Sequence, residues 1–136
     1  MSPMVRRVVA VITALVAASA VVMVFEFLGS RLFPATGVDT TDRTQIENAM
    51  RTGLIPMGAM LMVAAGWVVA AVVGATAALR IGREGGRWPT MIFAALFTLV
   101  CAMNLLAFPH PAWMWFVGIV VVPAAAVLAG RDRSAS

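Results

Sequence analysis

The chain has 136 residues, of which 62% are hydrophobic and 12% are charged, and its formal net charge is +4. This composition is too apolar for an ordinary soluble domain. The basic residues are all arginines, and they flank the apolar segments instead of forming one basic face, so no nucleic-acid partner is predicted.

The apolar residues form four blocks of membrane-spanning length. A spanning helix needs about 20 consecutive apolar residues, and the spans are predicted at residues 5–28, 54–79, 89–108 and 112–129. These spans take up most of the chain. The prediction is therefore an all-α integral membrane protein, a four-helix bundle in a single transmembrane domain over residues 1–136.

The first span is predicted to end at Gly29 and Pro34, because proline cannot continue a helix. Its basic start and the small residues 18–20 also resemble a cleaved signal peptide. The apolar run continues to Leu28, however, and this favours an uncleaved span.

The loop at residues 29–53 is the only long connection, and it is predicted to hold a short amphipathic helix in its second half. Asp39 or Thr41 is expected to cap the start of this helix, and Gly53 to end it. Because its apolar residues recur at helical spacing, the helix should lie on the membrane surface or cover the mouth of the bundle. Those residues are Ile46, Ala49 and Met50.

The arginines predict the orientation of the chain. Cytoplasmic loops carry an excess of basic residues, and seven arginines lie on one side of the spans against three on the other. A bacterial inner-membrane protein with both termini in the cytoplasm is therefore predicted. The seven are Arg6, Arg7, Arg80, Arg83, Arg87, Arg131 and Arg133, and the three are Arg31, Arg43 and Arg51.

The second span carries a small residue at every fourth position. Such a row lets two helix backbones approach closely. Packing within one chain is the favoured interpretation, because four spans must first pack against each other. A homo-oligomer formed through this helix is the alternative. The row consists of Gly66, Ala70, Gly74, Ala78 and Gly82.

Glu26 is the main candidate for function, because an acid within a span usually marks a site that faces the bundle interior or a water-filled cavity. The alternative is that it reaches the headgroups or pairs with Arg31. Asn104, near the end of the third span, and His110, between two prolines in the next turn, are predicted at the same outer level. Together the three form a candidate ligand site.

The leading hypothesis is a binding or stabilising module whose one-sided outer site holds a lipid, a small molecule or a partner helix. A proton-coupled transporter that uses Glu26 and His110 is the first alternative. The second is a lipid-acting enzyme, with His110 as base for a nucleophile such as Ser30. Catalysis is the less favoured class, and no metal or cofactor is predicted, since the chain has no Walker loop and no H-E-x-x-H motif.

Three motifs carry a family resemblance. Glu26 and Gly29 form E-x-x-G, and Phe33-Pro34 follows. A P-H-P-x-W motif runs from Pro109 to Trp113. Together these resemble a group of small bacterial four-span membrane proteins without an established activity, so the resemblance implies a fold and no mechanism. Small multidrug exporters also carry an acid in their first span, but there it lies near mid-membrane.

Overall fold

The computed structural model describes residues 1–83 and 87–131, and these residues form helices and no strand. Four segments are long and apolar enough to cross a membrane, which confirms the all-α fold with four spans. The first three are α1 (Pro3–Leu32), α3 (Met57–Ile81) and α4 (Trp88–Ala107). The fourth joins α5 (Ala112–Phe116), η2 (Val117–Val121) and α6 (Val122–Ala129), and α2 (Arg43–Arg51) lies in the long loop.

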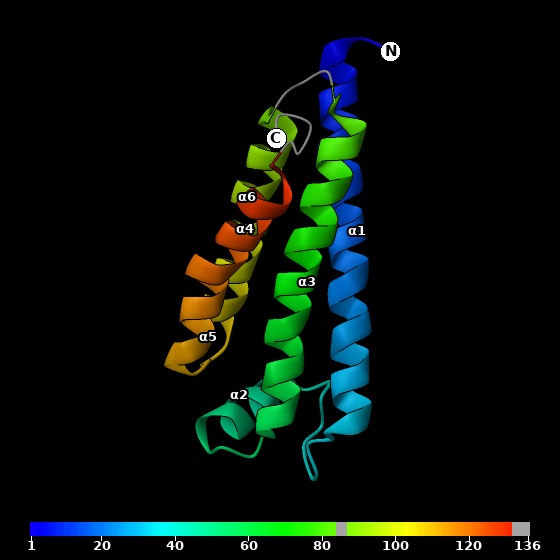
Figure 1. Cartoon of the computed structure of the whole chain (residues 1–136). Helices are drawn as coiled ribbons and strands as arrows, with labels where there is room; N and C mark the ends of the chain where they lie inside the picture. The colour runs from blue at the N-terminus through cyan, green and yellow to red at the C-terminus, as the bar shows by residue number, and fades with distance from the viewer. Residues whose placement is uncertain (84–86, 132–136) are drawn as a thin grey trace.

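The spans alternate in direction, so the connections gather at two ends of the bundle (Figure 1). We call one the α2 end, where α2 lies beside the turn between α4 and α5. The start of α1 and the end of α6 lie at the opposite end, which we call the arginine end. Its described arginines are Arg6, Arg7, Arg80, Arg83, Arg87 and Arg131. Arg133 lies outside the described residues.

Small residues bring α1 and α3 together along their length. Ala10, Ala14 and Ala18 of α1 are fully buried, and all five members of the predicted row on α3 are buried as well. A Cβ at Gly66 would lie 2.7 Å from the Cβ of Phe25 in α1. The backbones therefore approach too closely for a larger residue, as expected for helices that associate in lipid.

The row of small residues on α3 packs against two neighbouring helices. Four residues advance a helix by slightly more than one turn, so an i+4 row drifts around the helix axis. The row meets α1 at Gly66, but at Gly74 it meets Phe93 of α4, and at Gly82 it meets Pro89. The row is thus covered by helices of the same chain.

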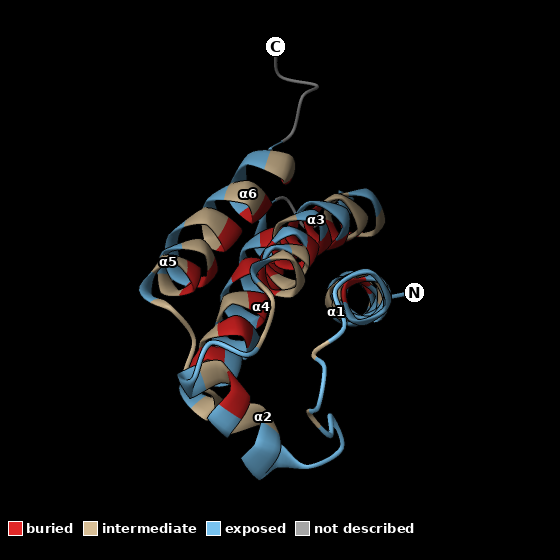
Figure 2. Cartoon of the chain, turned by 90° about the horizontal axis from the view of Figure 1, so that it is seen from below, coloured by how far each residue is buried: buried red, intermediate tan, exposed pale blue. Residues whose placement is uncertain are grey.

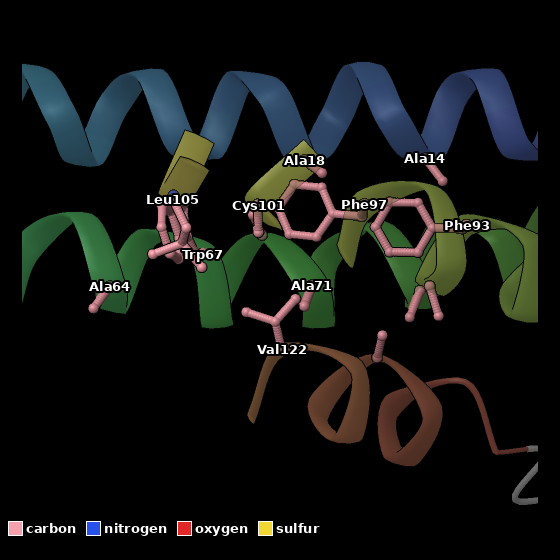
Figure 3. Close-up of a cluster of buried hydrophobic side chains, with 14 of the residues drawn as sticks. Ala14, Ala18, Ala64, Trp67, Ala71, Phe93, Phe97, Cys101, Leu105 and Val122 are labelled. Atoms are coloured by element: carbon pink, nitrogen blue, oxygen red, sulfur yellow. The ribbon is translucent and has the colours of Figure 1, made fainter. Parts of the chain in front are cut away.

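The centre of the bundle is apolar and tightly filled (Figure 3). The rings of Phe93 and Phe97 stack 5.5 Å apart, between Ala14 and Ala18 of α1 and the α3 backbone. Trp67 of α3 belongs to this core and is 2% exposed. Among the described residues Thr90 is the only buried polar one, and it lies near the arginine end.

Two helix ends differ from the prediction. Gly29 does not end the first span; α1 continues to Leu32, and Pro34 follows the cap residue Phe33. Gly29 is buried, and a Cβ there would lie 3.1 Å from the Cβ of Met62. Its role is therefore close packing inside the helix. The second span begins at Met57, after Pro56, instead of at residue 54.

The fourth span is not one regular helix, which the sequence interpretation missed. Residues 117–121 form a π-helical segment, and Pro123 follows it. Proline has no N–H and its ring crowds the preceding turn, and one wider turn accommodates this without leaving the membrane. Gly118 in this segment lies against Trp67 and Leu105.

The loop helix is confirmed, with a different cap. Asp42 is its N-cap and accepts from the N–H of Thr44, whereas Asp39 and Thr41 lie just before it. Gly53 ends the helix as predicted, with φ +74°. The N–H of Leu54 then donates to the carbonyl of Ala49 at 2.8 Å, which closes a Schellman turn.

We expect Gly74→Ala to lower the free energy of unfolding by about 1–3 kcal/mol, because overpacking a filled core has this cost. The new methyl group would overlap the ring of Phe93, which is fully buried and stacked on Phe97. Denaturant unfolding in micelles measures the change. Ala65→Val, on the exposed face of the same helix, adds volume without a clash and serves as the control. Equal stabilities of Gly74→Ala and wild type would contradict the close contact.

Candidate functional site

His110 lies in the turn between α4 and α5, at the α2 end. Its backbone N–H donates to the carbonyl of Phe108 at 2.9 Å, which forms a γ-turn centred on Pro109. Its ring Nδ1 lies 2.9 Å from the same oxygen. Because a carbonyl only accepts, Nδ1 carries the proton in this bond, and Nε2 has no partner among the described residues.

The imidazole ring of His110 is half-buried between aromatic side chains. Its centroid is 6.2 Å from that of Trp67, in α3, and 6.4 Å from that of Phe108. The two flanking prolines fix the turn that holds the ring there. His110 thus closes the centre of the bundle at the α2 end and stabilises the turn after α4.

Arg43 joins α2 to the same turn. Its Nη2 donates to the carbonyl of Ala107, the last residue of α4, at 3.1 Å. Its guanidinium carbon lies 5.3 Å from the centre of the Phe108 ring, and its Nε pairs with Glu47 at 3.2 Å. A cation at a helix C-terminus stabilises the free carbonyls there, so Arg43 holds α2 against the bundle mouth.

The segment before α2 is organised by Asp39. Its carboxylate accepts from both the N–H and the hydroxyl of Thr41, and these two bonds lower the pKa of Asp39. Its backbone N–H donates to the side chain of Gln45 in α2. The carboxylate is therefore charged at neutral pH and supports the approach of the loop to the helix.

Glu26 lies on the exposed side of α1, and not in the bundle interior. It follows Val22 by one turn, and Val22 is partly buried against the core. The carboxylate is thus at the margin between the packed and the exposed face. No hydrogen bond or ion pair joins it to another described residue. Arg31 does not pair with it, because the Arg31 guanidinium lies over the ring of Phe27, 5.1 Å from its centre.

Asn104 shares the depth of Glu26. Helices α1 and α4 run in the same direction (Figure 1), and Ala18 lies beside Phe97 (Figure 3). Asn104 follows Phe97 by seven residues, and Phe25 follows Ala18 by the same number, so Asn104 lies at the level of Phe25 and Glu26.

No hydrogen bond, ion pair or ring contact joins the three predicted residues to one another. The side chain of Asn104 is exposed and forms no bond with another described residue. His110 turns towards Trp67, in the centre of the bundle. Glu26 and Asn104 are therefore two unpartnered polar groups on the surface near the α2 end, and His110 belongs to the adjacent framework.

The contact expected for the enzyme alternative is absent from the described residues. The hydroxyl of Ser30 donates to the carbonyl of Phe27 at 2.8 Å, and no hydrogen bond links it to His110. The described residues also contain no group of three or more His, Cys, Asp or Glu side chains placed to hold a metal ion.

Sequence reasoning missed three residues of this end: Arg43, Trp67 and Phe108. The sequence places Arg43 only in the charge balance, because its contact with Ala107 depends on where α2 lies against α4. Trp67 and Phe108 both contact the His110 ring, and the contact with Trp67 joins residues far apart in the chain.

Comparison with known proteins gives no relative for this chain: no family model, curated protein or solved structure matches it.

We expect Arg43→Gln to loosen α2 without unfolding the bundle. The exposed helix would lose a cation–π contact, a carbonyl hydrogen bond and the ion pair with Glu47, together about 1 kcal/mol, so amide exchange over residues 43–51 should accelerate about fivefold. Hydrogen-exchange mass spectrometry measures this. Arg51→Gln, in the same helix but without a described partner, should leave exchange unchanged. If amide exchange accelerates equally in Arg43→Gln and Arg51→Gln, the lost positive charge of the helix explains the effect, and the contacts of Arg43 do not.

Proposed function

We propose that this multi-pass membrane protein is a binding module without catalytic activity, and that it holds a lipid, a small molecule or a partner helix at its α2 end. Glu26 and Asn104 are the contacting groups, and His110 stiffens the neighbouring turn. The observation that carries the proposal is an exposed carboxylate on a spanning helix that forms no ion pair with a described residue.

The lack of a described ion-pair partner for Glu26 indicates the chemistry of the ligand. A carboxylate in a spanning segment is costly unless it is paired or hydrated, and Arg31 is held over Phe27 instead. A positive group from outside the chain would satisfy Glu26, and the Asn104 amide at the same level offers one further acceptor and two donors. The ammonium headgroup of an aminophospholipid has this chemistry and is our first candidate.

The filling of the bundle favours binding over transport. A proton-coupled transporter needs polar groups along a path between both ends. The described interior is occupied by apolar side chains, among them Trp67, Phe93 and Phe97, and its one buried polar residue lies near the arginine end. Proton exchange between Glu26 and His110 also lacks a described contact. These observations support a site that opens on one side only.

The orientation forms part of the proposal. The arginine end carries most of the basic residues, so we place it, with both termini, on the cytoplasmic side of a bacterial inner membrane. The site at the α2 end then faces the outer leaflet.

Native mass spectrometry of protein released gently from its own membrane tests the proposal. We expect wild type to retain a mass that matches an aminophospholipid, and Glu26→Gln to lose about nine-tenths of it, since a charged pair contributes roughly a factor of ten. Ser19→Ala, seven residues earlier on the same face, should bind as wild type does.

The retained mass also separates the other ligands. A small-molecule or protein mass that disappears in Glu26→Gln would support the site and replace the lipid as its occupant. If wild type and Glu26→Gln carry identical masses, or none, Glu26 holds no ligand and the proposal is wrong.

A further inference from the structure

A small cavity opens at the arginine end, far from the residues of the proposed outer site. It lies where α4 begins and α6 ends, and its volume is about 80 Å³. One water needs only roughly 10–15 Å³ of such space. Four of the lining residues are exposed, so the cavity reaches the surface of the bundle. The lining residues are Arg87, Thr90, Met91, Val127, Gly130 and Arg131.

Two arginines without a described side-chain partner line this cavity. Arg87 is the N-cap residue of α4, and Arg131 follows the end of α6. Neither guanidinium forms a hydrogen bond or an ion pair with another described residue, whereas the guanidinium of Arg43 donates to the carbonyl of Ala107 and that of Arg6 to the carbonyl of Ile81 at 2.8 Å. Two like charges at one small cavity repel each other, and an anion between them removes this cost.

Thr90, whose buried hydroxyl lacks a partner among the described residues, borders the same cavity. Thr90 is 2% exposed, and its Oγ1 has no hydrogen-bond partner. Its methyl group packs against Gly130, where a Cβ would overlap it. A buried hydroxyl that lacks a bond destabilises the fold, so an acceptor supplied by a ligand would be favourable here.

The backbone adds to the attraction for an anion. Helix α4 begins at the cavity, and its N-cap residue provides no side-chain acceptor for the first turn. Free N–H groups and the positive end of the helix dipole favour a negative group at this place. Helix α6 ends there with the opposite dipole, and the positive charge of Arg131 counters it.

We propose that this cavity binds the phosphate group of an acidic phospholipid. Arg87 and Arg131 would hold the phosphate oxygens, since guanidinium groups match phosphate geometry, and Thr90 would donate its hydroxyl. Met91 and Val127 are exposed and apolar beside the cavity, which suits the acyl chains of a lipid. Basic pockets between spanning helices are known to take anionic headgroups.

Titration of the full chain in detergent micelles with dioleoyl phosphatidylglycerol, followed by native mass spectrometry, tests this site. Dioleoylglycerol has the same acyl chains without a phosphate, and inorganic phosphate has no acyl chains. We expect wild type to bind phosphatidylglycerol at least about tenfold more tightly than either, as charged hydrogen bonds imply. The lipid-phosphate assignment would be wrong if dioleoylglycerol bound as tightly as phosphatidylglycerol. It would also be wrong if inorganic phosphate alone bound as tightly.

Arginine variants separate the site from general attraction between charges. The double variant Arg87→Gln and Arg131→Gln should weaken phosphatidylglycerol binding about a hundredfold, from two charged contacts. Arg80→Gln, at the same end but outside the cavity, should weaken it no more than about fivefold. If Arg80→Gln and either single variant, Arg87→Gln or Arg131→Gln, lose affinity equally, only the diffuse charge of this end attracts the lipid and the proposal fails.

Thr90→Val provides a second and independent test. Valine has nearly the same shape and no hydroxyl, so the lipid-free protein should unfold at a higher temperature, because an unpaired buried group is removed. The same variant should bind phosphatidylglycerol about threefold to tenfold more weakly. Unchanged affinity in Thr90→Val would remove Thr90 from the site. The unfolding temperature and the phosphatidylglycerol affinity of Thr90→Val do not depend on the proposed site at the α2 end. We therefore expect Glu26→Gln to bind phosphatidylglycerol as tightly as wild type does.

Discussion

The close approach of α1 and α3 is the contact on which the rest of the structure depends. In lipid, helices gain little from burying apolar surface, so their association rests on dispersion between backbones that come very near. Ala10, Ala14 and Ala18 on one side and the small residues of α3 on the other make this approach possible. Because α3 also contacts α4 through Gly74, it forms the centre of the bundle, and the large side chains Phe93 and Phe97 fill the space beside it.

Local chemistry explains what the sequence could predict. The four spans were found because apolar length is a property of each segment alone, and Gly53 was recognised because a helix C-terminus favours positive φ. The errors concern residues whose role depends on a neighbour. Gly29 has the chemistry of a helix end, yet it packs against Met62 inside α1. Pro123 in an apolar run is a signal of the π segment, but it was overlooked.

The sequence predicts the depth in the membrane at which the candidate-site residues lie, but not the direction in which their side chains point. Alternating spans place Glu26, Asn104 and His110 near one end, whatever the arrangement of the helices. Which way each side chain points depends on the rotation of its helix in the bundle. That rotation is set by the small residues that choose the packed face, so Glu26 falls at the edge of this face and His110 turns inward to Trp67.

The spans differ in length in a way that the membrane must accommodate. At about 1.5 Å per residue, α1 and α3 extend roughly 45 and 38 Å, whereas α4 and the fourth span extend roughly 30 and 27 Å. The longest and the shortest lie on opposite sides of the bundle, with α3 and α4 between them (Figure 2). A hydrocarbon layer is about 30 Å thick, and the uncharged stretch of α1 at residues 8–25 covers roughly 27 Å of it, so the charged ends of α1 extend beyond the hydrocarbon. The extra turns of α1 therefore carry Arg6, Arg7 and Arg31 to the headgroup level, where long basic side chains are favoured.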